Sequence, residues 1–392
     1  MPSKINHPPL EDVLPPLIFG CATFNHQYNP DPFALDTEGL VYKALSLGVR
    51  AFDTSPYYGP SEELLGAALN AELARKDFPR SEYLLLTKVG RIGGEEFDYS
   101  PEWIRYSIRR SLERLHTHYL DLVYCHDVEF VSDDEVLIAV KELRRIRDQE
   151  GTIRYVGISG YPVETLCRLA ERILEETGEP IDAVMSYANF TVQNTTLLTH
   201  GVPRLKAAGV RVVPNASPLG MGLLRRVGPP GFHPGKDVLE QAIKKISDFC
   251  DEHEDRIEVV SIRHALEQWM EEGSVVGSRG DPASGVPYRR ETIDHLGGGK
   301  LGVSVMGVSN DAELTKTMQV WRSILDGRET GKRLPIASGR WKKDHEWSIA
   351  RSRTVELLVE GCQDILGPLY NWAWDSPGPG YVNQRKKFGA PE

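Results

Sequence analysis

The sequence predicts a (β/α)8 barrel, also called a TIM barrel, with a long insertion before its eighth strand and a C-terminal extension. Along the chain, eight short apolar runs alternate with longer amphipathic runs, the order expected of a parallel sheet covered by helices. The first apolar run ends LIFGCATF, without the GxGxxG fingerprint of a doubly wound dinucleotide-binding sheet. We therefore favour a closed barrel over an open sheet.

The eight apolar runs read as buried strands because they are short and nearly continuous in hydrophobic residues. An open parallel sheet with helices on both faces would give the same local pattern, so the number of units decides for the barrel. The predicted strands are Leu17–Ala22, Val49–Thr54, Tyr83–Val89, Leu120–His126, Ile153–Ser159, Ala183–Tyr187, Val210–Ala216 and Val303–Ser309.

Capping residues mark the starts of several amphipathic runs. Asp36, Ser61, Ser100 and Ser132 each precede or open a run, and Pro101 stands where a first-turn proline belongs. The predicted helices are Thr37–Leu47, Glu62–Ala74, Pro101–Leu115, Asp134–Glu150, Val163–Glu176, Thr195–Ala208, a double stretch from Lys236 to Glu272, and Asp311–Leu325.

The chain is expected to form a single domain over residues 1–392, with a barrel core at about 17–326. Residues 273–300 are rich in glycine, proline and charge and form an inserted loop. Residues 334–392 form a C-terminal extension packed on the barrel, with a helix near Arg353–Leu366. Neither segment reads as an independent domain.

Composition limits the function classes. A net charge of −10 over 392 residues excludes a basic nucleic-acid surface and gives no sign of membrane attachment. Five scattered cysteines without a CxxC pair indicate neither a disulfide framework nor a metal site. The first residues lack the apolar core of a signal peptide, so we expect a cytoplasmic protein that handles a small molecule. No helix shows an exposed apolar seam, which leaves monomer and homodimer open.

Polar residues follow the predicted second, third and fourth strands at their carboxyl ends. Asp53, Lys88 and His126 end these strands, and Tyr58 lies in the loop just after Asp53. Singly, each has an ordinary structural explanation: a turn cap, a solvent-seeking lysine, a core histidine, a packed tyrosine. Because consecutive barrel strands are neighbours, all four are expected to converge on one pocket.

These four residue types suit proton transfer beside a hydride transfer. A phenol with a reference pKa of about 10 needs help near neutrality, and an adjacent ammonium lowers the phenol pKa. A carboxylate would hold the lysine charged, and a histidine would orient the substrate oxygen. Such a site serves a nicotinamide-dependent reaction and needs no metal.

Several segments resemble the aldo-keto reductase superfamily. FDTSPYYGPSEELLG, LTKVG and LVYCHD are similar to its tyrosine, lysine and histidine segments. The resemblance implies that Tyr58 is the proton donor or acceptor, supported by Asp53, Lys88 and His126. GISGY, NASPLGMGLL and MGVSNDAELTKTM resemble its cofactor-binding segments, and the likeness runs from about residue 17 to 325. The implied cofactor-binding residues are Ser159, Ser186, Ser217, Leu219, Gly222, Gly307, Ser309 and Glu313.

Three departures from the family pattern carry information. Gly160 stands where asparagine is frequent, Ser186 where glutamine is frequent, and Ala216 where an aromatic residue commonly stacks on the nicotinamide. The NASPLGMGLL and GISGYP forms and the tryptophan-rich tail resemble the sugar-oxidising branch, which includes L-galactose dehydrogenases and fungal D-arabinose 1-dehydrogenases. This implies oxidation of D-arabinose, or of sugars like L-galactose and L-fucose, at C1 to the lactone.

The charged residues of the MGVSNDAELTKTM segment bear on the choice between NAD and NADP. Gly307, Ser309 and Glu313 occupy positions where relatives that prefer NADP carry basic residues, and Glu313 would repel a 2′-phosphate, although Lys316 is near. We expect NAD over NADP. Two alternatives stay open: an NADPH-dependent carbonyl or aldehyde reductase acting on a pyridoxal-like substrate, and a non-catalytic nicotinamide-binding partner subunit. Candidate sugar contacts are Asn25, His26, Asp127, Asn189, Trp372 and Trp374.

Overall fold

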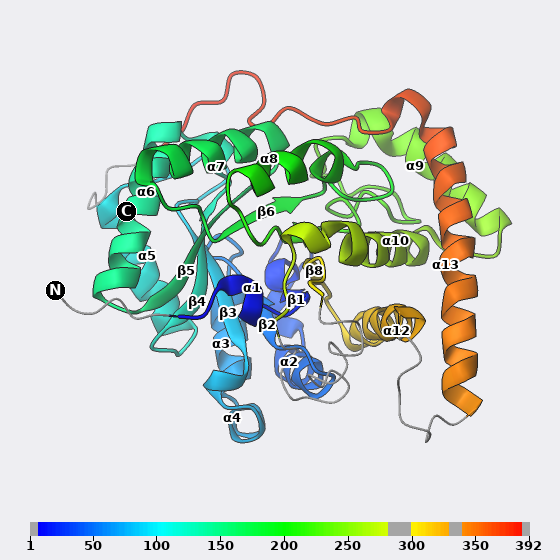
Figure 1. Ribbon diagram of the computed structural model, residues 1–392, viewed down its shortest axis with the longest axis horizontal. Helices are drawn as coiled ribbons and strands as arrows, with labels where there is room; N and C mark the ends of the chain where they lie inside the picture. Colours follow the sequence, from blue (N-terminus) through cyan, green and yellow to red (C-terminus); the bar gives the residue numbers. More distant parts are fainter. Residues whose placement is uncertain (1–6, 281–298, 329–338, 386–392) are drawn as a thin grey trace.

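Eight parallel strands close into a barrel in the order β1 to β8, and β8 pairs with β1. The structure is a computed structural model that describes residues 7–280, 299–328 and 339–385. Helices surround the strands (Figure 1), so the predicted (β/α)8 barrel is confirmed. The strands are β1 (Leu17–Gly20), β2 (Ala51–Asp53), β3 (Leu84–Val89), β4 (Leu120–His126), β5 (Ile153–Gly160), β6 (Ala183–Tyr187), β7 (Asn215–Ala216) and β8 (Ser304–Gly307).

The seventh strand is much shorter than the predicted Val210–Ala216. Val212 forms only an isolated bridge to Ala183, and the regular ladder begins at Asn215. Pro214 has no N–H to donate, so it interrupts the ladder at this point. The carbonyl of Pro214 still accepts a bond from the Ser186 N–H at 3.2 Å, which keeps the barrel closed.

The predicted helices are present in the predicted order, with two local differences. The predicted helix Glu62–Ala74 is broken at Ala71, whose ψ of 147° is extended, and the predicted Thr195–Ala208 begins as a π-turn over Leu197–Gly201. The helices are α1 (Leu10–Val13), α2 (Thr37–Ser46), α3 (Ser61–Asn70), α4 (Glu72–Asp77), α5 (Pro101–Arg114), α6 (Asp133–Gln149), α7 (Val163–Thr177), α8 (Val202–Ala207), α9 (Lys236–Glu252), α10 (Ile257–Glu272), α12 (Asp311–Arg328) and α13 (Gly339–Leu366).

The apolar core has three parts. The barrel interior is filled by side chains such as Ile18, Leu86 and Tyr124, and a second, larger cluster lies between the strands and the helical ring. A third cluster joins α9 to the C-terminal helix through residues such as Ile246 and Leu358. A packed interior leaves the carboxyl ends of the strands as the place for a site.

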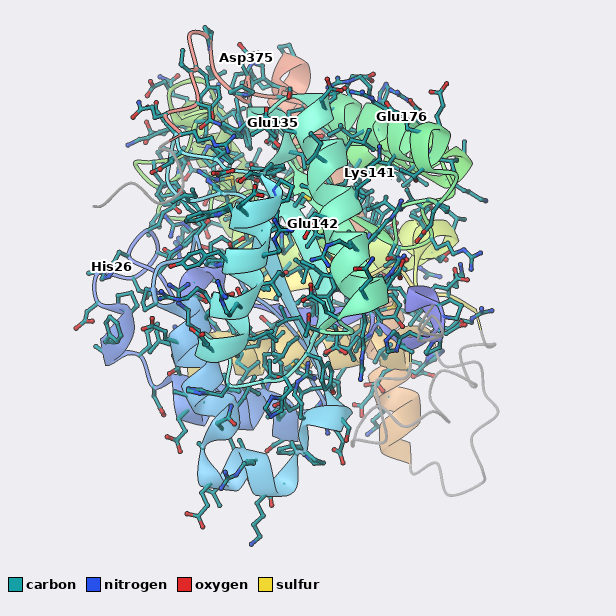
Figure 2. All side chains as sticks on the ribbon, turned by 90° about the vertical axis from the view of Figure 1, so that its left-hand side faces the viewer. His26, Glu135, Lys141, Glu142, Glu176 and Asp375 are labelled. Atoms are coloured by element: carbon teal, nitrogen blue, oxygen red, sulfur yellow. The ribbon has the colours of Figure 1, made fainter. Side chains whose placement is uncertain are left out.

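Ion pairs cover the outer helices. Figure 2 shows Glu135, Lys141 and Glu142 along α6. Glu142 pairs with Arg145 of the same helix at 2.8 Å and with Arg105 of α5 at 3.1 Å. These contacts tie neighbouring helices together on the outside of the barrel.

The C-terminal segment starts with a helix longer than the predicted Arg353–Leu366. Helix α13 packs against α9, α10 and α12, at the right of Figure 1. After α13, residues 370–385 run back across the molecule as the red trace in Figure 1; we call this segment the strap. Most of the predicted 273–300 insertion lies outside the described residues. Its described beginning is a 3-10 turn over Gly273–Val276, and Ser278 then pairs with Leu301.

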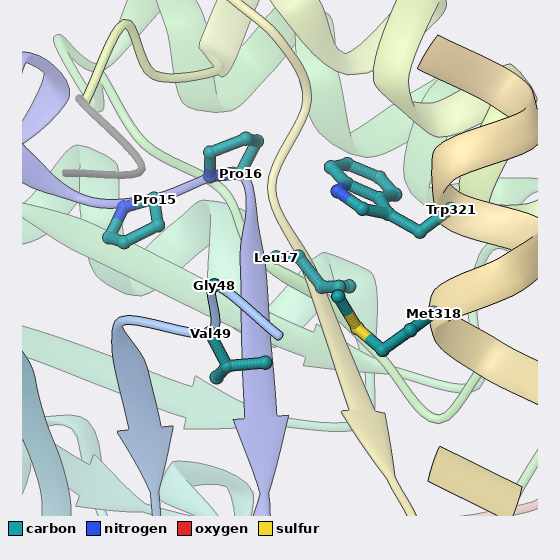
Figure 3. Close-up of a pocket in the computed structure, with 7 residues that line it drawn as sticks. All are labelled: Pro15, Pro16, Leu17, Gly48, Val49, Met318 and Trp321. Atoms are coloured by element: carbon teal, nitrogen blue, oxygen red, sulfur yellow. The ribbon is translucent and has the colours of Figure 1, made fainter. Parts of the chain in front are cut away.

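A small hollow lies at the opposite end of the barrel, where β1 begins. It is lined by Pro15, Pro16, Leu17, Gly48, Val49, Met318 and Trp321 (Figure 3). Its volume of about 10 Å³ suffices for about one water molecule, which is too small for a sugar or a nicotinamide. We therefore treat it as a packing gap.

Two features are missing from the part of the chain that the structure describes. None of its helices is long and apolar enough to cross a membrane. Nor does any group of three or more histidine, cysteine or acidic residues there have an arrangement that could hold a metal ion.

Candidate active site

Asp53 and Lys88 form a buried ion pair at the carboxyl ends of β2 and β3. The Lys88 Nζ lies 2.5 Å from Asp53 Oδ1 and donates to the Thr54 carbonyl at 2.9 Å. Burial lowers the pKa of Lys88, but Asp53 and Tyr58 raise it more, so the pKa lies above the usual value for lysine. Lys88 is therefore a fixed positive charge at neutral pH.

Tyr58 lies on a tight turn directly after β2. Its N–H donates to the Ser55 carbonyl at 3.0 Å, and Gly59, with a φ of 58°, carries the chain on in the left-handed region. The Lys88 Nζ lies 4.8 Å from the centroid of the Tyr58 ring. Burial raises the pKa of Tyr58 and Lys88 lowers it, with a net rise. Lys88 therefore lowers the pKa of the phenol as expected from the sequence, but burial, which removes water from the phenol, raises it more.

His126 ends β4 and faces Tyr58. The two rings lie edge to face with centroids 5.6 Å apart, and Nδ1 lies 3.0 Å from the Ser55 hydroxyl oxygen. The Tyr99 hydroxyl holds the His126 carbonyl at 2.6 Å. Tyr99 can approach only because Gly90 has no side chain, since a Cβ there would lie 1.9 Å from the Tyr99 ring.

The imidazole of His126 is uncharged at neutral pH. Burial, reinforced by Lys88 and Arg91, lowers its pKa well below the ordinary value. A neutral imidazole has one N–H and one lone pair, so His126 can donate to a substrate oxygen only if the proton is on the nitrogen facing it. Asp53, Tyr58, Lys88 and His126 thus lie together as expected from the sequence, while their roles stay predictions.

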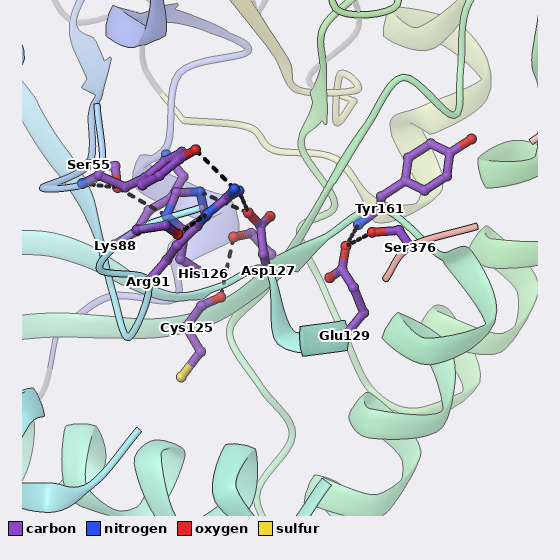
Figure 4. A network of polar contacts seen from close by, with 12 residues as sticks. Ser55, Lys88, Arg91, Cys125, His126, Asp127, Glu129, Tyr161 and Ser376 are labelled. Carbon is purple, nitrogen blue, oxygen red and sulfur yellow. Dashed lines mark hydrogen bonds and ion pairs between the residues drawn. The ribbon is translucent and has the colours of Figure 1, made fainter. Parts of the chain in front are cut away.

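A second charged pair lies beside His126 and was not predicted as a unit. Arg91, just after β3, forms an ion pair with Asp127 and donates to the Tyr57 hydroxyl at 3.0 Å. Asp127 Oδ2 lies 3.7 Å from His126 Nε2. Figure 4 shows this network running on from the Lys88 and His126 cluster. The signal in the sequence was a charged residue shortly after each strand, Arg91 after β3 and Asp127 after β4.

The strap closes over the same end of the barrel. Glu129, in the turn after β4, accepts bonds on Oε1 from the Tyr161 N–H and the Ser376 hydroxyl, both at 3.1 Å (Figure 4). Trp374 stacks on Tyr161 with ring centroids 3.7 Å apart and planes 9° from parallel. Of the predicted sugar contacts, Trp374 therefore lies at the rim of the barrel.

The predicted cofactor residues Ser159 and Ser186 are buried at the ends of β5 and β6. The Ser159 hydroxyl donates to the Cys125 carbonyl at 3.2 Å, and the Ser186 oxygen accepts from Asn189 at 2.9 Å. Gly160 is paired with Ser186 across the two strands, so the two hydroxyls come from adjacent strands. Ser159 keeps free lone pairs, and Ser186 keeps its proton to donate.

The other predicted cofactor residues follow β7 and β8. Ser217, Leu219 and Gly222 lie in the loop after β7, where Ser217 and Gly222 have positive φ. Gly307 ends β8, and the Ser309 N–H donates to the Glu313 carboxylate at 2.7 Å. Both segments lie at the carboxyl ends of strands, and no bond joins either of them to the tyrosine and lysine cluster among the described residues.

Three of the predicted sugar contacts form local hydrogen bonds. The Asn25 Oδ1 accepts from the Gln27 N–H at 2.6 Å in a turn, and His26 is exposed at the edge of the molecule (Figure 2). The Asn189 side chain holds the Tyr161 carbonyl at 2.5 Å. These hydrogen bonds shape loops, and a role of the three residues in binding a sugar stays a prediction.

The fold and this cluster together define a class of protein. A barrel with a tyrosine, lysine, carboxylate and histidine at the ends of neighbouring strands can move a proton beside a reacting carbonyl or alcohol, as oxidoreductases require. The model of the Aldo/keto reductase family matches residues 16–331. The chain belongs to this family, whose members use nicotinamide cofactors.

The chain is similar to two sugar dehydrogenases. It is 44% identical over 275 residues to D-arabinose 1-dehydrogenase of Saccharomyces cerevisiae, covering 70% of this chain and 81% of that protein. It is 39% identical over 234 residues to L-galactose dehydrogenase of Arabidopsis thaliana, covering 59% and 70%. Among solved structures, a glycerol dehydrogenase from Gluconobacter oxydans matches with a TM-score of 0.54 and 19% identity over 95% of this chain and 97% of that one, which shows the fold alone.

Proposed function

We propose that this protein is an NAD-dependent aldose 1-dehydrogenase that oxidises D-arabinose, and sugars like L-galactose and L-fucose, at C1 to the lactone. The observation that carries the proposal is the Tyr58, Lys88, Asp53 and His126 cluster in a chain that is 44% identical to a D-arabinose 1-dehydrogenase. The surroundings of His126 support a polyhydroxy substrate. The Arg91 and Asp127 pair there offers donors and acceptors to sugar hydroxyls, which an apolar aldehyde would leave unused.

The strand ends fit a nicotinamide. A primary carboxamide carries one donor group and one acceptor, and the free lone pairs of Ser159 and the free proton of Ser186 match them in that order. The nicotinamide, when bound, accepts the hydride. The protein's own residues orient the sugar and handle the proton.

The acidic start of α12 supports NAD as the preferred cofactor. Glu313 lies in the first turn of α12 and accepts from the Ser309 N–H. Helix N-termini bind anions through such N–H groups, and here a carboxylate of the protein already takes that place. A 2′-phosphate would have to displace Glu313 and would be repelled by it.

The proposed proton path uses all four residues of the cluster. His126 donates a hydrogen bond to the anomeric oxygen, which orients C1. The Tyr58 oxygen takes the proton of the anomeric hydroxyl while C1 gives up its hydride, and the C1–O bond becomes the lactone carbonyl. Lys88 stabilises the phenolate that must form before each proton is taken, and Asp53 holds Lys88 in place.

The test measures initial rates of NADH formation from NAD with D-arabinose, L-galactose and L-fucose, repeated with NADP. We expect turnover with NAD and at least one sugar. Tyr58→Phe should abolish it and leave cofactor binding nearly unchanged, because only the hydroxyl is lost. Activity with NADPH and an aldehyde such as pyridoxal, and none with sugars, would favour the reductase. Cofactor binding without turnover of any sugar or carbonyl would favour a non-catalytic partner subunit.

A further inference from the structure

The neutral imidazole of His126 leaves open which nitrogen carries the proton. Donation to the anomeric oxygen requires the proton on Nε2, because Nδ1 lies against the Ser55 hydroxyl 3.0 Å away. In the other tautomer Nε2 would present a lone pair to the substrate oxygen and repel it. The tautomer is therefore a condition of the proposed function, on which this inference rests.

The hydrogen bonds of Ser55 decide the tautomer. Its Oγ accepts from the Tyr57 N–H at 3.1 Å, and a backbone N–H can only donate. The Ser55 side chain is buried, and among the described residues its hydroxyl has no hydrogen bond other than those to His126 and Tyr57. If Nδ1 carried the proton, the hydroxyl hydrogen would be buried without a partner, which costs about 1–3 kcal/mol.

The opposite side of the ring favours the same tautomer. The Asp127 Oδ2 lies 3.7 Å from Nε2, too far for a good hydrogen bond but close enough for electrostatics to matter. A protonated Nε2 is attracted to this carboxylate and a lone pair on Nε2 is repelled, but Arg91 pairs with the same Oδ2 and weakens both effects. The hydrogen bonds of Ser55 therefore decide the position of the proton, and the carboxylate adds a smaller preference for Nε2.

We propose that Ser55 is a positioning residue that donates its hydroxyl proton to His126 Nδ1 and so fixes the N–H of Nε2 toward the reacting oxygen. Ser55 also shapes the turn of the proton-transfer residue, because its carbonyl accepts from the Tyr58 N–H at 3.0 Å. One side chain and its carbonyl thus align both groups that face the substrate oxygen. Removal of the Ser55 hydroxyl should change the tautomer of the His126 imidazole and leave the fold intact.

The direct test is 15N NMR of the full-length protein with labelled histidine. The chain has eleven histidines, so His126→Asn identifies the His126 signals. We expect the wild-type protein to show a protonated Nε2 and a bare Nδ1. A proton on Nδ1 in the wild-type protein would overturn the proposal. This readout needs no substrate, so it stands apart from the choice of sugar and from any failure of the proposed activity.

Kinetics test the consequence. Ser55→Ala should lower kcat by roughly tenfold or more and leave the KM for the nicotinamide cofactor unchanged, while Ser55→Thr, which keeps a hydroxyl, restores most of the rate. Ser61→Ala is the matched control: it removes another buried hydroxyl nearby, one that bonds Thr54 and the Cys21 carbonyl, and should keep the wild-type rate. A Ser55→Ala protein with the wild-type kcat and an unchanged tautomer would refute the role. If Ser55→Ala does not fold, the wild-type spectrum still decides.

Discussion

At the scale of single residues, the site depends on a buried charge pair whose members need each other. Asp53 Oδ1 pairs with Lys88, and Asp53 Oδ2 is buried without a hydrogen-bond partner. Burial raises the pKa of Asp53, and the lysine opposes that rise. Removing either charge leaves the other buried without a partner. A substitution at Asp53 or Lys88 should therefore lower the stability of the protein as well as its activity.

Asp53→Asn should therefore destabilise the protein by about 3–5 kcal/mol, besides lowering turnover, because Lys88 keeps its charge and loses its partner. Urea unfolding measures the change in the free energy of unfolding. Asp311→Asn is the control: its ion pair with Lys43 is also 2.5 Å long, but its carboxylate is 71% exposed, and we expect less than about 1 kcal/mol. Equal losses in the two variants would contradict the argument.

At the scale of elements, strand ends could be predicted and contacts between loops could not. Asp53, Lys88 and His126 follow from the barrel register alone, because parallel neighbours end at the same rim. Ser55 and Glu129 were missed because their partners depend on the direction of a side chain in a turn. No pattern in the sequence predicts that Glu129, in the turn after β4, will accept a hydrogen bond from Ser376, which lies 247 positions later.

The strap illustrates this limit. Its composition predicted an extension packed on the barrel, but its route follows from separate anchors: Trp374 on Tyr161, Ser376 on Glu129, and two bonds between Asn383 and the backbone of Phe97. These anchors lie beyond the ends of β5, β4 and β3. The strap thus borders the site on the side of the Arg91 and Asp127 pair.

Trp374→Ala should loosen the strap. Losing an aromatic pair removes about 0.5–1.5 kcal/mol beyond its buried area, and 1 kcal/mol is about a fivefold change in an opening equilibrium. Amide hydrogen exchange of residues 370–385 should therefore speed up by about that factor or more. Trp347→Ala, at an exposed tryptophan of α13, should leave the exchange of the strap unchanged. Identical exchange in the wild-type and Trp374→Ala proteins would show that the stacking does not hold the strap.

At the scale of the whole molecule, charge and burial set how stability depends on pH. The chain carries a net charge of −10. Several of its acidic residues are buried by the fold. Burial and the nearby Asp127 raise the pKa of Glu129 to about 8. Arg91 compensates the charge of Asp127, but no bond among the described residues joins Arg91 to Glu129.

The arrangement at Glu129 fits a protonated acid. Oε1 accepts both hydrogen bonds, and Oε2 is buried without a partner, an arrangement that is less costly for a neutral oxygen than for a charged one. In the unfolded chain the pKa of this group is 4.5. Between these two pH values the folded state binds more protons, so the contribution to stability is complete below about pH 4.5 and is lost as the pH rises through about 8.

Glu129→Gln should remove this dependence. The wild-type free energy of unfolding should include a fall with rising pH between about 4.5 and 8, with a slope of at most about 1.4 kcal/mol per pH unit for one proton. Urea titrations at several pH values, compared between wild type and Glu129→Gln, isolate that slope. Glu176→Gln, which removes a carboxylate on the outer face of α7 (Figure 2), should not remove it. Parallel curves for the wild-type and Glu129→Gln proteins would mean that Glu129 is ionised in the folded protein, and that the strap is held by a carboxylate.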